Sequence, residues 1–266
     1  MDTPDATSGR GTSVPCGGVD DRTRTELAAT FDRAAELYDR VRPGFPAPAL
    51  DWILPPGARR VLDLGAGTGK LTEALVARGV DVVALDPAPN MLASLQAKLP
   101  GVATRVATAE ATGLPAAGVD AVVVGSAFHW FDRPDAEREM ARVLRPGGVV
   151  GLLWNLRDPA SVTVQAFHEA QAHATETRPS EHSDVTLDRR WFGPTRHRQF
   201  RHTQTLRPEQ LVELVASRSY VIAMAEPDRT RLLDRVRRFV ATDPALVGRE
   251  TFELPYLTVV RRATRR

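Results

Sequence analysis

The chain has 266 residues, of which 42% are hydrophobic and 26% are charged, a composition typical of one globular domain with an ample core. Its net charge is only +2, from 35 basic and 33 acidic residues, so the charge gives little support to a nucleic-acid partner. The single cysteine, Cys16, excludes an internal disulfide and agrees with a cytoplasmic location, and we expect neither a signal peptide nor a membrane-spanning segment.

The beginning of the chain predicts a disordered head followed by a helix. Residues 1–21 are rich in Gly, Ser, Thr, Pro and Asp, which indicates disorder, and we expect residues 22–266 to form a single domain. Apolar residues at helical spacing predict an amphipathic helix over about residues 25–39. Proline and glycine residues then end that helix, and a short helix over residues 47–54 leads into the first strand.

Residues 61–79 predict a buried strand, a tight turn and a helix, because an apolar run breaks into alternating glycines and then gives way to helical spacing. Glycines in such a turn allow a ligand to approach the outward-facing N–H groups of the helix N-terminus. A Walker A loop is excluded, because Leu64 and Leu71 stand where that motif requires a glycine and a hydroxyl. A dinucleotide fingerprint is poorly matched, because the glycines of residues 65–69 alternate and Lys70 occupies the position of the third glycine.

A second strand, over residues 80–86, ends in Asp86, whose carboxylate is placed to accept hydrogen bonds from both hydroxyls of a ribose. With the G-x-G-x-G loop and the acidic Asp63 in the strand before it, this pattern resembles the class I S-adenosylmethionine-dependent methyltransferases, in particular the type 11 group. The resemblance covers about residues 37–154. It implies a Rossmann-like α/β fold with a doubly wound, mostly parallel sheet of seven strands and an N-terminal helical lid.

The resemblance also implies a set of contacts with S-adenosylmethionine, the cofactor expected for this family. The residues are Tyr38, Arg42, Asp63, Gly65, Ala66, Gly67, Thr68, Gly69, Asp86, Pro87, Met91, Thr108, Ala109, Glu110, Ser126 and Trp130. Other roles stay open for some of them: Tyr38 could pack within its helix, Arg42 could be a surface charge, and Met91 could belong to the core. Thr108 replaces the Asp that relatives use to contact the adenine amino group, which removes a charge-assisted contribution.

The rest of the chain continues the alternation of strands and helices, as in a right-handed doubly wound sheet. We expect a helix over 90–99, strands over 102–108 and 119–125, a helix from about 133 to 144 with Asp132 as its N-cap, a turn at 145–148 and a strand over 149–154. Residues 61–155 would form the cofactor-binding core. Residues 156–195, which are polar and contain few aromatic side chains, would form a cap insertion on the substrate side.

The last part of the chain predicts a strand near 199–206, helices near 208–217 and 227–242, and a strand over 251–262. The resemblance implies that this last strand enters the sheet antiparallel, and Pro255 suits a bulge or an edge there.

His129 is the candidate general base, because it follows the strand over 119–125 at the ligand edge of the sheet and histidine titrates near neutral pH. His129 and Trp130 could instead close the cofactor pocket by packing. We expect no metal site, because no acid stands at the tip of that strand to hold Mg²⁺ and the histidines have poor ligand spacing. No Asn-Pro-Pro-Tyr or Asp-Pro-Pro-Tyr motif follows the strand, so nucleobase amine methylation by that motif is not indicated.

The sequence therefore predicts a cytoplasmic, metal-independent enzyme that transfers a methyl group to O, N or C of a small organic molecule, for example in secondary metabolism. Nucleic-acid and membrane partners are not expected. Two alternatives stay open. One is a tRNA or protein methyltransferase, supported only by Arg261, Arg262, Arg265 and Arg266. The other is a module or cyclase that binds the cofactor without transferring its methyl group.

Overall fold

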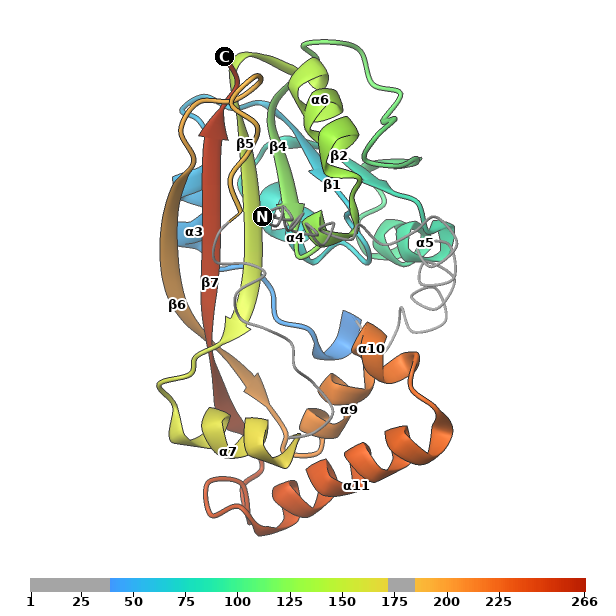
Figure 1. Ribbon diagram of the computed structural model, residues 1–266, viewed down its shortest axis with the longest axis vertical. Coiled ribbons are helices and arrows are strands. Elements are labelled where there is room, and N and C mark those ends of the chain that lie inside the picture. The colour runs from blue at the N-terminus through green and yellow to red at the C-terminus, as the bar shows by residue number, and fades with distance from the viewer. Residues whose placement is uncertain (1–38, 172–184) are drawn as a thin grey trace, which may run out of the picture.

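The structure is a computed structural model that describes residues 39–171 and 185–266 (Figure 1). The predicted disordered head, Tyr38 and nearly all of the helix expected over 25–39 therefore lie outside the described residues. Seven strands form one sheet in the order β3-β2-β1-β4-β5-β7-β6. Their bounds are β1 Arg60–Leu64, β2 Asp81–Asp86, β3 Ala103–Val106, β4 Val119–Gly125, β5 Leu144–Arg157, β6 Arg196–Leu206 and β7 Phe252–Thr264. The prediction of a seven-stranded α/β sheet is confirmed.

The order of the strands reverses between β1 and β4. β1 pairs in parallel with β2 on one side and with β4 on the other, and β4 pairs in parallel with β5. Connections therefore leave toward opposite faces of the sheet at this point, which is where open α/β sheets bind their ligands.

β7 lies between β5 and β6 and is antiparallel to both, as the resemblance implied. Its register with β5 ends at Arg157 and Tyr256, and Pro255 pairs with Thr203 of β6 while its carbonyl accepts from Asp158 N–H over 2.9 Å. Pro255 thus stands where the ladder between β5 and β7 ends, a position that tolerates a residue without an N–H. β5 is longer than the predicted strand over 149–154, because it keeps pairing with β7 as far as Arg157. The predicted turn at 145–148 falls inside β5, where its register with β4 shifts.

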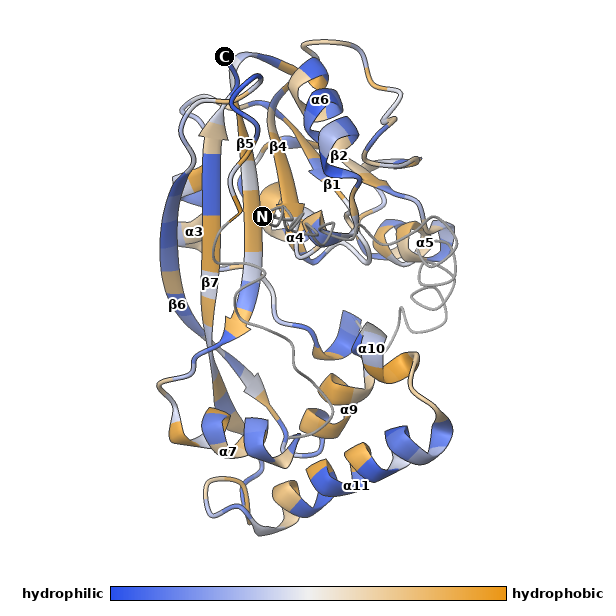
Figure 2. Ribbon diagram, viewed as in Figure 1, coloured by the Kyte–Doolittle hydropathy of each residue, from blue (hydrophilic) through white to orange (hydrophobic). Residues whose placement is uncertain are grey.

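Successive residues of the central strands point to opposite faces of the sheet, and each face carries its own hydrophobic cluster. Leu62 packs with helix α6 (Arg133–Val143) on one face, whereas Val61 packs with α3 (Ala47–Ile53) and α4 (Lys70–Val76) on the other. Burial on both faces explains why β4 is hydrophobic along its length, in contrast to the hydrophilic edge strand β6 (Figure 2). The helices of the core are α3 Ala47–Ile53, α4 Lys70–Val76, α5 Pro89–Lys98, the 3₁₀ turn η1 Phe128–Trp130 and α6 Arg133–Val143. Asp132 is the N-cap residue of α6 as predicted, although its side chain makes no capping hydrogen bond.

Four helices gather beyond the sheet, at the end where β5 stops (Figure 1). They are α7 Val162–Ala170, α9 Gln210–Ala216, α10 Ser219–Ile222 and α11 Glu226–Thr242. They share another hydrophobic cluster, here called the helix cluster, which includes Phe167 of α7, Leu214 of α9 and Tyr256 of β7. Figure 2 shows hydrophobic residues recurring along α11, whose Val236 is fully buried in this cluster. Among the described residues, no helix is both long enough and apolar enough to cross a membrane.

The described residues of the expected cap, 156–195, pack against two different parts of the molecule. α7 joins the helix cluster, whereas Leu187 and Phe192 are buried in the core beside α6. Gly193 N–H also donates to Thr264 O over 2.8 Å, which ties this part to the far end of β7. The helices at the ligand edge are therefore supplied largely by residues 206–254, because their apolar faces find partners in α7 and in the projecting ends of β6 and β7.

Candidate functional site

The glycine loop after β1 is fixed at its start and open at its middle. The N–H groups of Gly65 and Ala66 donate to Leu85 O over 2.8 and 2.9 Å. Gly65 has φ +76°, and a Cβ there would lie 2.6 Å from the Cβ of Ala127, so the packing requires glycine. Gly67 has φ +55°, but a Cβ there would meet nothing within 4 Å. The middle of the loop therefore borders open space, as a loop that receives a ligand must.

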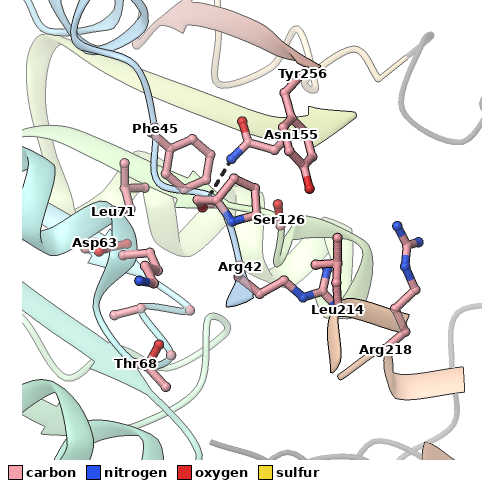
Figure 3. Close-up of a pocket in the computed structure, with 16 residues that line it drawn as sticks. Arg42, Phe45, Asp63, Thr68, Leu71, Ser126, Asn155, Leu214, Arg218 and Tyr256 are labelled. Atoms are coloured by element: carbon pink, nitrogen blue, oxygen red, sulfur yellow. Dashed lines mark hydrogen bonds between the residues drawn. The ribbon is translucent and has the colours of Figure 1, made fainter. Parts of the chain in front are cut away.

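A pocket lies at this loop, beside the point where the strand order reverses (Figure 3). Its lining combines the end of β1, the loop, the tip of β4 and segments that are distant in sequence. The lining residues are Arg42, Pro43, Phe45, Asp63, Gly65, Ala66, Gly67, Thr68, Lys70, Leu71, Gly125, Ser126, Asn155, Leu214, Arg218 and Tyr256. The residues of this set that the sequence predicted are Arg42, Asp63, Gly65, Ala66, Gly67, Thr68 and Ser126.

Asp63 is fully buried at the floor of the pocket. Its Oδ2 accepts a hydrogen bond from Thr72 Oγ1 over 2.6 Å, but its buried Oδ1 has no partner among the described residues. Burial raises the pKa of Asp63 to about 7. The hydrogen bond from Thr72 lowers this pKa, and the nearby charge of Asp86 raises it further. An unpartnered buried carboxylate oxygen favours a ligand that brings a cation or a hydrogen-bond donor.

Asp86 stands at the end of β2 and holds the loop in place. Its Oδ2 accepts from Gly67 N–H and its Oδ1 from Ala88 N–H, each over 2.9 Å. A carboxylate offers about four lone-pair sites, so each oxygen can still accept from another donor. Beyond it, Pro87 is exposed and Met91 is buried against Ala88. Ribose contact by Asp86 remains a prediction that this position suits.

Among the described residues, the predicted cofactor contacts Gly69, Thr108, Ala109, Glu110 and Trp130 are not part of the pocket lining. Gly69 is the N-cap of α4, in the left-handed conformation. After β3, Thr108 is exposed, Ala109 is buried in the core, and Glu110 Oε1 accepts from Asp132 N–H over 2.8 Å. Their contacts with an adenine therefore stay predictions.

His129 is exposed and does not line the pocket. Ser126, with φ +56°, turns the chain at the tip of β4, and the following 3₁₀ turn buries Phe128 while His129 faces outward. The imidazole lies against the ring of Trp130, with 4.7 Å between centroids. The positive φ at a non-glycine residue marks strain of the kind found at functional sites, and it falls on Ser126. His129 stays a predicted base that lies outside the pocket lining.

Several lining residues were missed in the sequence, and tertiary structure explains why. Tyr256 reaches the pocket because β7 is antiparallel, so that its beginning meets the edge where the parallel strands end. The antiparallel direction expected for the last strand was the one feature of the sequence analysis that could have identified Tyr256. Asn155 was not missed, since it directly follows the predicted fifth strand and was expected to face the ligand; it donates to Gly44 O over 2.9 Å and accepts from Thr258 Oγ1 over 2.6 Å. Nothing in the sequence distinguishes Arg218 from the other arginines. Within residues 39–171 and 185–266, no group of three His, Cys, Asp or Glu side chains could hold a metal ion.

Comparisons with known proteins agree with this geometry. A family model described as a methyltransferase domain matches residues 62–152. An uncharacterized methyltransferase of Mycobacterium tuberculosis is 47% identical over 91% of this chain and 98% of its own length. An uncharacterized methyltransferase-like protein of Schizosaccharomyces pombe is 30% identical over 86% of this chain and 93% of its own length. The solved structure of a proposed type II methyltransferase from Anaeromyxobacter dehalogenans has a TM-score of 0.59 and 24% identity, and it covers 84% of this chain and 96% of that one.

Proposed function

Because this chain belongs to the class I S-adenosylmethionine-dependent methyltransferases, we propose that its pocket binds S-adenosylmethionine and that the enzyme methylates a small organic molecule. The observation that carries the cofactor assignment is the buried, unpartnered Oδ1 of Asp63 beneath an open glycine loop. An α-ammonium group opposite this oxygen would supply the missing hydrogen bond and the positive charge.

The residues of the site fit the rest of the cofactor in the same way. Gly67 leaves room for a ligand to cross the loop, and Asp86 stands at the next strand end with acceptor capacity for a ribose. When bound, S-adenosylmethionine would supply a methyl carbon on a positively charged sulfur; the acceptor lone pair would form a bond to that carbon in line as the C–S bond breaks and its electrons leave on sulfur. The protein contributes by holding the acceptor atom in line with the methyl carbon and the sulfur. Such positioning is worth on the order of 7–11 kcal/mol and needs no covalent bond to the protein.

An acceptor that bears a proton must lose it, and a general base then contributes about 10²–10⁴-fold. His129 is the base predicted from the sequence. A carboxylate acceptor would need no base, which would suit a pocket with no histidine among the described residues of its lining.

The alternative of a tRNA or protein substrate rested on four arginines near the end of the chain. Arg262 donates to Trp52 O over 2.8 Å, and Arg265 donates to Leu144 O. Since these two side chains bind backbone carbonyls of the fold, the basic end gives less support to an electrostatic tail for nucleic acid. We therefore retain the small-molecule acceptor, and the cytoplasmic location expected from the lone Cys16 belongs to the same proposal.

A calorimetric titration with S-adenosylmethionine and S-adenosylhomocysteine tests the cofactor. We expect saturable binding that Asp63→Asn weakens and that Asp81→Asn, at the opposite end of β2 from the pocket, leaves unchanged. Absence of binding by folded wild type would refute the proposal. For the reaction, a product heavier by one methylene unit indicates transfer, whereas a product of unchanged mass indicates the cyclase alternative.

A further inference from the structure

Arg157 and Arg218 form a pair of guanidinium groups at the end of the sheet where the helices gather; we call them the guanidinium pair. Arg157 is the last residue of β5, opposite Tyr256 in β7, and Arg218 lies between α9 and α10. Arg218 and Tyr256 line the pocket. Figure 3 shows Arg218 and Leu214 on the opposite side of the pocket from Asp63 and Thr68.

The charge of the guanidinium pair is uncompensated in the described part of the structure. Arg157 Nη1 and Arg218 Nε are buried and have no hydrogen-bond partner there. The ion pairs among the described residues include neither arginine, whereas Arg40, on the surface of the same region, pairs with Glu213. The contacts of Arg157 are neutral: its guanidinium lies 4.6 Å from the centroid of the Phe167 ring, and its Nη2 is 3.5 Å from Gln171 Oε1.

The electrostatic effect of the pair is visible on the groups around it. Burial, followed by the charge of Arg218, lowers the pKa of Arg157 to about 9. Burial, followed by the charges of Arg157 and Arg218, lowers the pKa of His168 in α7 to about 4. Both arginines are partly buried as residues, but a guanidinium with a buried, unused donor is costly to maintain, and in a cleft it indicates a binding function. A carboxylate or phosphate offers several acceptor oxygens, and guanidinium groups bind such oxyanions with strong charge-assisted hydrogen bonds.

The two sides of the pocket thus favour opposite charges, with the carboxylate of Asp63 on one side and the guanidinium pair on the other. In the proposed function, which this inference rests on, the cofactor occupies the loop and the Asp63 side. The carboxylate of an α-amino acid is attached to the same carbon as its ammonium group, so a cofactor held at Asp63 keeps its carboxylate near that side. The acceptor has to enter from the remaining side, where β5, β7 and α9 meet.

We propose that the guanidinium pair binds a carboxylate or phosphate group of the methyl acceptor, and that the enzyme therefore acts on small anionic molecules. Tyr256 lines the pocket as Arg218 does, and it pairs with Arg157 in the sheet. Its phenolic O–H can donate to the same oxyanion, since burial raises the pKa of Tyr256 and keeps it protonated. The bound oxyanion anchors the acceptor and does not itself receive the methyl group, because an oxygen neutralised by guanidinium groups is a weaker nucleophile than a free one.

The test is a calorimetric titration of the full chain with citrate and with inorganic phosphate, in the presence and absence of saturating S-adenosylhomocysteine. Triethyl citrate and trimethyl phosphate are the uncharged counterparts. We expect saturable binding of at least one oxyanion and none of its ester; preference for citrate or for phosphate then distinguishes the two chemical sources. Arg218→Gln and Arg157→Gln should each weaken this binding at least tenfold. The matched control is Arg231→Gln, which removes an exposed arginine of α11 that pairs with Asp228.

The outcomes separate this inference from the proposed cofactor. Arg218→Gln should leave the affinity for S-adenosylhomocysteine within about twofold of wild type. An equal loss of both affinities would assign the pair to the cofactor's own carboxylate and overturn the inference, as would the absence of any oxyanion binding by folded wild type. If Arg157→Gln fails to fold, the oxyanion affinity of Arg218→Gln alone tests the inference. Oxyanion binding without any binding of S-adenosylhomocysteine would instead refute the proposed cofactor and leave the anion site standing.

Discussion

The backbone N–H of Gly67 donates to Oδ2 of Asp86 over 2.9 Å, which joins the middle of the glycine loop to the carboxyl end of β2. One side chain thus has two tasks: it shapes the loop, and it stands where a ribose is expected. This double task makes Asp86 the residue whose loss should affect cofactor binding most directly.

We expect Asp86→Ala to weaken binding of S-adenosylhomocysteine by about 1.5–3 kcal/mol, which is roughly a ten- to hundredfold rise in Kd, because hydrogen bonds to a charged group are lost. Isothermal titration measures the change. Asp81→Ala is the control, since Asp81 is exposed at the other end of the same strand. Equal affinities of wild type and Asp86→Ala would remove Asp86 from the cofactor site.

Gly67→Ala should reduce cofactor affinity at least tenfold, because the new methyl group would project into the open space beside the loop. Gly57→Ala is a matched control: Gly57 also has a positive φ, and a Cβ there would likewise meet nothing within 4 Å, but it lies between α3 and β1. Both variants should lose about 1–2 kcal/mol of stability from the left-handed backbone. Equal effects of the two variants on binding would show that strain, and not occupied ligand space, weakens the site.

Asp63 predicts a pH dependence of stability in the ligand-free protein. Burial raises its pKa in the folded state from 3.8 to about 7. Between these two values the folded chain keeps the proton that the unfolded chain has released, so the free energy of unfolding falls as pH rises from about 4 to about 7. Asp63→Asn keeps the shape and removes this slope. Urea unfolding at several pH values should therefore show the variant gaining stability relative to wild type up to about pH 7; a constant difference would contradict the raised pKa.

His129→Ala should leave the affinity for S-adenosylhomocysteine unchanged, because its side chain is exposed and does not line the pocket. If His129 is the base, turnover of a proton-bearing acceptor should fall by about 10²–10⁴-fold. Steady-state kinetics across pH, once an acceptor is known, measure this effect. Unchanged turnover would leave positioning as the whole contribution of the protein.

The pKa of His168 can show whether the guanidinium pair has bound an oxyanion. Its pKa of about 4 results from burial and from the charges of Arg157 and Arg218, so an oxyanion that neutralises these charges should raise it. NMR titration of the imidazole signals with and without citrate or phosphate would detect the shift. His202 serves as the internal control, because burial lowers its pKa without a contribution from these arginines. Parallel shifts of both histidines would indicate a general effect of the added salt.

The sequence alone was sufficient to predict the cofactor half of the fold. The strand, loop and helix around residues 61–79 are local, because apolar runs and glycine positions act within a few residues. Asp63, Gly65 and Gly67 therefore fell in the pocket as predicted. The placement of Asp86 also followed from the rule that parallel strands present their carboxyl ends at one edge of the sheet.

Tertiary structure decided the acceptor half. Tyr256 reaches the pocket because β7 runs against β5, and Arg218 reaches it because β6, which runs against β7, ends at the same edge and leads into α9. His129, four residues after Gly125 at the end of β4, turned outward because Phe128 took the buried position. Local pattern thus determined the loop side of the pocket, where we propose that the cofactor lies, because that part of the lining is continuous in sequence. The opposite side, which we propose faces the acceptor, is assembled from distant segments by packing, which no local pattern specifies.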